Sequence, residues 1–471
     1  MLEPRYRTDV GALLDAGTRF ALPVPVAERR GLAIGWLWLG VAALAGSGLF
    51  AILLVLARTP GLRAWFPVAD FFRVALVIHV DLSVLVWFVA CSGLLLNVAA
   101  PPRRPEAGVT ALVLTSLGAA CMLASPFVGT GAVVMSNYVP VLDRWLFLYG
   151  LALVAAGFAV DLLRYLAASV RATGLYDGDD SLRFGLLGAA VAGVLSLAAL
   201  VWSWIETPPS LSASSYYEAL FWGPGHVVQF AWTLLMLVAW LWLASASGAR
   251  LALTPRIAAL LLGVGAAAAL VSPMIYASWP VFAPEHQRMF TWLMRFGGGL
   301  AILPIGLAVG LGLLIGERPT GSRCVLRSAL LASMLLFAIG GAIGFLIRGD
   351  DVRVPAHYHG SIVGVTLAMM GIAYLLGPKL GKRPLPERLA RWQIRLYAAG
   401  QLMHIAGLVW SGGYGVRRKA AGAAQSLDAL SQIAGMGLMG AGGLLAIVGG
   451  LLFVLVMLRV LPMRESRAMD G

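Results

Sequence analysis

The chain has 471 residues, of which 60% are hydrophobic and only 12% are charged, and its mean hydropathy is +0.85. A soluble domain carries about twice that share of charged residues, so the composition excludes a soluble globular protein and predicts an integral membrane protein. The net charge of +13 would suit nucleic acid in a soluble protein. In a membrane protein, basic residues set the topology of the loops, and we expect no nucleic-acid partner.

Twelve apolar runs are each long enough to cross a bilayer, which takes about 20 mostly apolar residues in a helix. Turn signals such as Pro101-Pro102 and Pro208-Pro209 separate them. The sequence therefore predicts an all-α fold, a polytopic membrane bundle of twelve transmembrane helices. The runs cover about residues 31–57, 72–100, 108–135, 139–168, 183–205, 217–245, 253–278, 288–316, 324–347, 356–378, 391–413 and 433–461.

The polar ends and loops predict the topology. Residues 1–30 are expected to form a cytoplasmic N-terminal tail, 31–461 the twelve-helix membrane domain and 462–471 a cytoplasmic C-terminal tail. With both termini cytoplasmic, about two thirds of the 35 lysines and arginines fall on the inner side, as the positive-inside tendency requires. We expect the protein in a bacterial inner (plasma) membrane.

The cysteines argue against a covalently attached cofactor. Cys91, Cys121 and Cys324 form neither a CxxC pair nor a CxxCH haem-attachment motif, and each is expected to be a small core residue. A covalently bound haem or a dicopper centre for electron entry would then belong to a second subunit.

The stretch Arg353-Val-Pro-Ala-His357-Tyr-His359 opens one of the apolar runs. Two residues at positions i and i+2 of a helix project about 200° apart. One helix can therefore present an imidazole to each of two metal centres on opposite sides. The alternative is two interfacial histidines bonded to loop carbonyls, and the spacing leaves both open.

Four of the six histidines share one depth. With the predicted topology, His79, His226, His357 and His359 all lie in the outer third of the membrane. One layer of bound metal or cofactor explains a shared depth, whereas scattered core histidines do not. The Gly-Pro-Gly that precedes His226 predicts a break in the helix there. His404 is expected to be a core histidine.

Basic residues also appear where the topology does not predict them. Arg417-Arg418-Lys419 follows the eleventh run on the outer side. Arginine forks pair with carboxylates, so two haem propionates that point outward would explain this exception. A solvated loop is the alternative.

These features together resemble the catalytic subunit of the heme–copper oxidase superfamily, similar to cytochrome c oxidase subunit I and most like the B-type oxygen reductases and nitric oxide reductases. The resemblance covers nearly the whole chain. It implies two haems, with His79 and His359 as the ligands of a low-spin iron and His357 as the proximal ligand of a high-spin iron. Bis-imidazole iron suits electron transfer.

The resemblance also implies that His226 binds a distal copper and that Arg417 and Arg418 hold propionates. The family carries a His-His pair on helix 7, however, and this chain has Val271-Ser-Pro-Met274-Ile-Tyr there. Copper is therefore in question. Met274, a thioether suited to Cu(I), and His286, on the loop that follows, are the candidate replacement ligands.

A second departure concerns the tyrosine that oxygen reductases link to the helix 6 histidine. Phe230 stands four residues after His226, and Tyr276 is the candidate substitute. Glu206 and Glu218 flank helix 6 and either serve protons or are solvated. The inner half offers few polar residues, so we do not expect redox-driven proton pumping.

The sequence predicts a respiratory-type haem oxidoreductase subunit. It would pass electrons, delivered by a cytochrome c- or dicopper-type second subunit, from a low-spin to a high-spin haem that binds and reduces dioxygen or nitric oxide. The alternative is a copper-free dihaem electron-transfer, sensor or assembly protein without terminal reductase activity. A solute transporter is disfavoured because its site would lie near the midplane.

Overall fold

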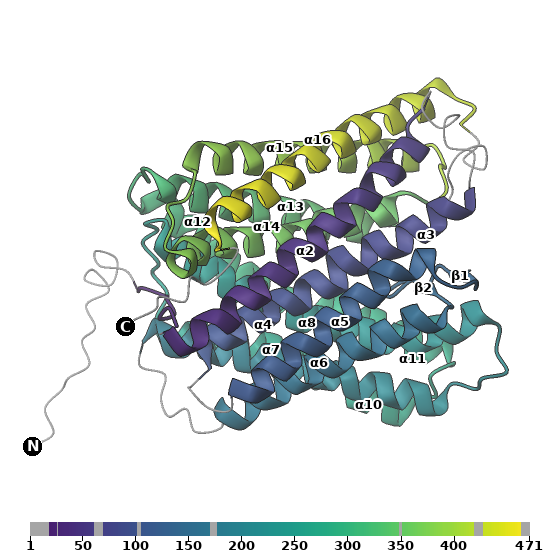
Figure 1. Ribbon diagram of the computed structural model, residues 1–471, viewed down its shortest axis with the longest axis horizontal. Helices are drawn as coiled ribbons and strands as arrows, with labels where there is room; N and C mark the ends of the chain where they lie inside the picture. The colour runs from purple at the N-terminus through teal and green to yellow at the C-terminus, as the bar shows by residue number, and fades with distance from the viewer. Residues whose placement is uncertain are drawn as a thin grey trace, which may run out of the picture.

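The computed structural model describes residues 18–25, 27–60, 69–100, 105–169, 177–347, 351–418 and 427–462. Within these ranges the chain forms long helices and one short hairpin (Figure 1). In chain order the helical spans are α2 (Ala27–Arg58); α3 (Ala69–Val80), η2 (Asp81–Val86) and α4 (Trp87–Ala99); α5 (Pro105–Ala124) with η3 (Ser125–Phe127); α6 (Trp145–Ser169); α7 (Gly178–Glu206); α8 (Ala213–Ala246); α9 (Pro255–Ala269) and α10 (Ser272–Ser278); α11 (Pro284–Trp292), η4 (Leu293–Gly297) and α12 (Gly299–Ile315); α13 (Ser322–Leu346); α14 (Arg353–Gly381); α15 (Glu387–Gly413); and α16 (Leu430–Val460).

These twelve spans confirm the predicted all-α membrane bundle. Eleven of them are long and apolar enough to cross a membrane. The remaining span, α15, has 27 residues, which is enough for a bilayer at 1.5 Å per residue. Its first turns carry Glu387, Arg388, Arg391 and Arg395, and these charges lower its hydropathy.

The centre of the bundle is made by α8 and α14. Of their apolar windows, 83% and 89% are buried, against 28% for the span Pro284–Ile315. An all-round apolar helix must be surrounded by other helices or by lipid, and the buried shares show that other helices surround α8 and α14. His226, His357 and His359 therefore lie on the two innermost helices.

The two ends of the bundle differ. The start of α2 and the end of α16 lie together, because Trp38 Nε1 donates to Pro462 O at 3.3 Å. The opposite end, which we call the hairpin end, holds the hairpin of β1 (Val133–Val134) and β2 (Val141–Leu142) and is where α3, α8 and α14 begin (Figure 1). The predicted tails fall largely on residues 1–17 and 463–471, outside the described residues.

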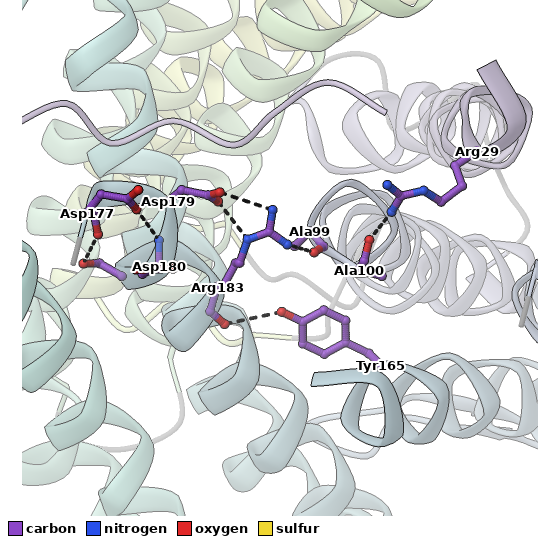
Figure 2. A network of polar contacts seen from close by, with 9 residues as sticks. Arg29, Ala99, Ala100, Tyr165, Asp177, Asp179, Asp180 and Arg183 are labelled. Atoms are coloured by element: carbon purple, nitrogen blue, oxygen red, sulfur yellow. Dashed lines mark hydrogen bonds and ion pairs between the residues drawn. The ribbon is translucent and has the colours of Figure 1, made fainter. Parts of the chain in front are cut away.

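At the end opposite the hairpin, two arginines cover the carboxyl end of α4. Arg29 of α2 donates to Ala100 O and Arg183 of α7 donates to Ala99 O (Figure 2). The last carbonyls of a helix lack partners within the helix and carry partial negative charge. Asp179 holds the Arg183 guanidinium at 2.9 Å, so three helices are fixed to one another here.

Two sequence expectations need correction. The runs 108–135 and 139–168 extend too far toward each other, because α5 ends at Ala124 and the β1–β2 hairpin precedes α6. Gly129, with a φ of +78°, turns the chain out of the helix, and valines at 133, 134 and 141 favour strand. The Gly-Pro-Gly motif does not break the helix before His226, since α8 continues from Ala213 to Ala246 with Pro224 inside it.

Candidate functional site

All six histidines are held in the same tautomer. In each, Nδ1 lies within hydrogen-bonding distance of a carbonyl oxygen, which can only accept, so a neutral ring carries its proton on Nδ1 and its lone pair on Nε2. The acceptors are Ser47 O for His79 (3.1 Å), Trp222 O for His226 (2.7 Å), Trp279 O for His286 (3.1 Å), Gly340 O for His357 (2.7 Å), Gln401 Oε1 for His359 (3.2 Å) and Met439 O for His404 (3.0 Å).

Three of these imidazoles gather between α3, α14 and α15. His79 and His359 are close enough to interact electrostatically. The ring of His404 lies 4.4 Å from that of His359, centroid to centroid. Ser47 Oγ adds a contact of 2.9 Å to His79 Nδ1. The structure therefore brings together the two histidines expected to bind one haem, and it places beside them His404, which sequence reasoning left as a core residue.

Arg58, at the end of α2, is a second residue that sequence reasoning missed. Its guanidinium interacts electrostatically with His359 and His404. Two of its nitrogens, Nε and Nη2, are buried and have no hydrogen-bond partner among the described residues. A buried cation is costly unless an anion accompanies it, so this position fits an anionic group such as a haem propionate. An arginine that ends the first apolar run was the available signal.

His357 lies on a different side of α14 from His359. Its Nδ1 bonds to Gly340 of α13, whereas His359 bonds to Gln401 of α15. The ring also lies against Gly344 of α13, where an added Cβ would come within 2.8 Å of Nδ1. The i, i+2 spacing therefore separates the two imidazoles as expected, and each is oriented by a different neighbouring helix.

His226 lies in a compact group of aromatic rings at the hairpin end. The group comprises Tyr138, Trp222, His226, Tyr276, His286 and Phe290, and we call it the aromatic cluster. Within it, the Tyr138 hydroxyl lies 2.8 Å from His226 Nε2. The ring centroid of Tyr138 is 4.7 Å from that of His226, and Trp222 packs at 4.8 Å on the same imidazole.

The hairpin delivers Tyr138 to this cluster. The side chain of Asn137 donates to Glu218 of α8 at 2.5 Å, and its backbone N–H donates to the same carboxylate at 3.0 Å. Glu218 is thus a tether for the loop, a role that the sequence did not suggest. The ring of Tyr138 then rests on Gly225, where an added Cβ would lie 2.2 Å from a ring carbon. The glycine is required by this close approach.

Tyr276 and His286 form the other half of the aromatic cluster. The hydroxyl of Tyr276 is 2.7 Å from Ser203 Oγ, and its ring lies 4.8 Å from that of His286. His286 is fully buried, and its Nε2 has no partner among the described residues. His226 and His286 both pack on Phe290, with centroid distances of 5.7 and 5.0 Å. His286 lies on α11, whereas the sequence analysis placed it on a loop, and its ring is buried.

The remaining candidates are not brought to the cluster in the same way. The side chain of Met274 is 66% exposed on the surface of the bundle, whereas His226 is buried. The prediction that Met274 replaces a copper ligand beside His226 does not fit this exposed position. Phe230 is buried on α8, one turn beyond His226, and contributes a ring without a hydroxyl.

The described residues do not fit a copper site around His226. Both of its ring nitrogens are engaged, Nδ1 with Trp222 O and Nε2 with the Tyr138 hydroxyl. Across the described ranges, the chain has no cluster of three or more histidine, cysteine, aspartate or glutamate side chains placed to hold a metal ion. Copper needs lone pairs that are free to donate, and here His286 Nε2 is the one unengaged imidazole donor of the aromatic cluster.

The double arginine, Arg417-Arg418, lies at the hairpin end of the bundle. Residues Asp351 and Arg417 form an antiparallel β-bridge, and Val352 N donates to Val416 O at 3.1 Å. This pairing holds Arg417 and Arg418 beside the start of α14, a few residues before His357 and His359. Arg417 is exposed and Arg418 is half-buried.

A twelve-helix bundle whose central helix α14 directs one imidazole toward α13 and another toward α15 is a histidine-bearing membrane protein of the heme–copper oxidase type. The chain belongs to the cytochrome c and quinol oxidase polypeptide I family, whose model matches residues 31–452. Its fold is similar to that of a chain in a heme–copper terminal oxidase dimer solved by cryo-EM. The TM-score is 0.74 at 16% identity, over 94% of this chain and 86% of that one.

Two relatives extend the comparison. The uncharacterized protein RP382 of Rickettsia prowazekii (strain Madrid E) is 29% identical over 499 residues, covering 91% of this chain and 96% of its own. An uncharacterized protein of Aquifex aeolicus (strain VF5) is 29% identical over 350 residues, covering 74% of this chain and 84% of its own. The family and the fold together show an integral membrane subunit of heme–copper oxidase type.

Proposed function

We propose that this subunit is a dihaem membrane oxidoreductase of respiratory type. Electrons would pass from a low-spin to a high-spin haem, where dioxygen or nitric oxide would bind and be reduced. The observation that carries the proposal is the set of imidazoles His79, His359 and His357, each fixed by an Nδ1 hydrogen bond with its Nε2 lone pair available. When bound, the haems would supply one-electron transfer and a site for a diatomic ligand.

Three histidines would bind the two haem irons, and other residues would orient their rings. His79 of α3 and His359 of α14 would hold the low-spin iron, and His357 of α14 would hold the high-spin iron through its Nε2. Ser47, Gln401 and Gly340 fix the orientation of the three rings, as outer hydrogen-bond partners of metal ligands do.

The arginines would hold the acidic edges of the cofactors. Arg58 is a cation with two buried nitrogens that have no hydrogen-bond partner among the described residues, close to His359 and His404, and a propionate would satisfy it. Arg417 and Arg418 would serve other propionates from the loop held against the start of α14.

The second candidate function is a copper-free dihaem electron-transfer, sensor or assembly protein without terminal reductase activity. One observation favours it, namely the engagement of both nitrogens of His226. Under either function, we propose that a second subunit of cytochrome c or dicopper type delivers the electrons. We also propose a bacterial inner-membrane location with both termini cytoplasmic.

Optical and electron paramagnetic resonance spectra of the purified protein test the assignment. We expect two haems per chain, one low-spin and one that binds carbon monoxide when reduced. His79→Ala or His359→Ala should abolish the low-spin signal, and His357→Ala should abolish carbon monoxide binding. A wild-type protein that contains no haem would refute the proposal, as would low-spin spectra unchanged in both single variants.

A further inference from the structure

The hydrogen bond between Tyr138 and His226 engages Nε2, the ring nitrogen that a distal copper would need as its ligand. Trp222 O accepts from His226 Nδ1 at 2.7 Å, which leaves the lone pair of this imidazole on Nε2. The Tyr138 hydroxyl lies 2.8 Å from that atom. A phenol oxygen at this distance from an unprotonated ring nitrogen donates its hydrogen to it.

The direction of this hydrogen bond follows from the tautomer of His226. Because Nδ1 carries the proton that Trp222 O accepts, Nε2 carries no hydrogen. The phenol O–H is then the hydrogen available between the two atoms, so Tyr138 is the donor. A lone pair that accepts this hydrogen cannot at the same time bind a metal ion.

The contact is built rather than incidental. Asn137 ties the hairpin to Glu218 through two hydrogen bonds of 2.5 and 3.0 Å. Gly225 removes the Cβ that would lie 2.2 Å from the ring of Tyr138. Trp222 packs edge-on against the Tyr138 ring, with centroids 5.8 Å apart. Three separate features thus hold the phenol on the imidazole.

We infer that this subunit has no distal copper, and that Tyr138 takes the place of the metal by capping His226 Nε2. The inference rests on the proposed function for its setting, a haem at His357, and it favours the second candidate function. The distal side would then hold a hydrogen-bonded phenol and imidazole instead of a second metal.

The inference predicts that copper can be introduced by removing one hydroxyl. Tyr138→Phe frees the lone pair of His226. His286 Nε2 is already buried with no partner in the described part of the chain, and its ring packs on the same Phe290 ring as His226. Imidazole is a suitable ligand for copper. We expect the variant to take up copper, and Tyr138→Phe combined with His226→Ala to lose it again.

The experiment measures copper and iron by elemental analysis in purified protein, after incubation with Cu(I) in a chelating buffer and removal of any affinity tag. We expect wild-type protein to hold iron without stoichiometric copper and Tyr138→Phe to gain copper. Tyr374→Phe, which removes a buried hydroxyl bonded to Gln393, is the matched control and should gain none. Retained haem spectra show that each variant is folded.

Two outcomes would overturn the inference. One is wild-type protein with one copper per two irons that His226→Ala removes. The other is a folded Tyr138→Phe variant that gains no more copper than Tyr374→Phe. Absence of iron from the wild-type protein would instead refute the proposed function, so the two failures are distinguishable.

Discussion

At the residue scale, the histidines of this protein are defined by what their Nδ1 atoms touch. Each of the six donates to a carbonyl oxygen, and four of those oxygens come from helices or loops distant in the chain. Tertiary packing therefore selects the tautomer, and the tautomer decides which nitrogen can bind iron. For His226 the same logic leads to the opposite result, because Tyr138 uses the remaining lone pair.

Gln401 offers a test of this orientation at the proposed low-spin haem. Its amide oxygen accepts from His359 Nδ1 at 3.2 Å, which makes the imidazole a stronger donor and would stabilise the oxidised iron of the proposed haem. Gln401→Leu should therefore raise the midpoint potential of the low-spin haem and keep its spectrum. Redox titration followed optically measures the shift.

The control for this experiment lies on the same helix. Gln393→Leu removes a buried amide that bonds to Tyr374 and should leave the potential unchanged. Gln401→Glu, a stronger acceptor, should move the potential downward. Equal shifts in the Gln401→Leu and Gln393→Leu variants would show that Gln401 acts only through packing.

At the element scale, the aromatic cluster forms on α8 because two of its glycines let tyrosine side chains approach the helix backbone closely. An added Cβ at Gly223 would lie 2.1 Å from the Tyr276 hydroxyl, and one at Gly225 would lie 2.2 Å from the Tyr138 ring. The Gly-Pro-Gly motif reads as a helix break in the sequence. In the bundle the helix continues through this motif, and its glycines leave room for the two tyrosines. Packing thus overrides the local preference of the residues.

Gly225→Ala should therefore destabilise the protein by about 1–3 kcal/mol, the usual cost of overpacking a filled interior. It should also loosen the contact between Tyr138 and His226. Gly310→Ala, on α12, meets nothing within 4 Å and should stabilise its helix by about 0.5–1 kcal/mol. Thermal unfolding in detergent compares the two variants, and equal melting temperatures would contradict the close packing at Gly225.

At the scale of the whole molecule, an even number of spans brings the start of the first span and the end of the last span to the same end of the bundle. Trp38 of α2 donates to Pro462 O after α16, and the hairpin lies at the opposite end (Figure 1). In the predicted topology, about two thirds of the 35 lysines and arginines fall on the side of the two termini. From the positive-inside tendency we propose that this side is cytoplasmic.

Labelling of single introduced cysteines in intact cells tests this topology. A cysteine at Ser214, an exposed residue in the first turn of α8 at the hairpin end, should react with a membrane-impermeant reagent. A cysteine at Thr320, between α12 and α13, should react only after the cells are opened. The reverse pattern would invert the orientation and place the proposed haem layer near the cytoplasm.

The sequence by itself determined the membrane bundle, the twelve spans and the candidate haem ligands, because apolar run length and the His-x-His spacing are local properties. It could not place Arg58, His404 or Tyr138, which lie in different parts of the chain and meet the site only after the helices pack. The sequence raised the question of copper because the run 253–278 lacks the His-His pair of the family. The structure bears on that question through a contact between residues that are far apart in the chain. Whether a lone pair is free depends on the neighbour that tertiary structure brings to it, and at His226 that neighbour is Tyr138.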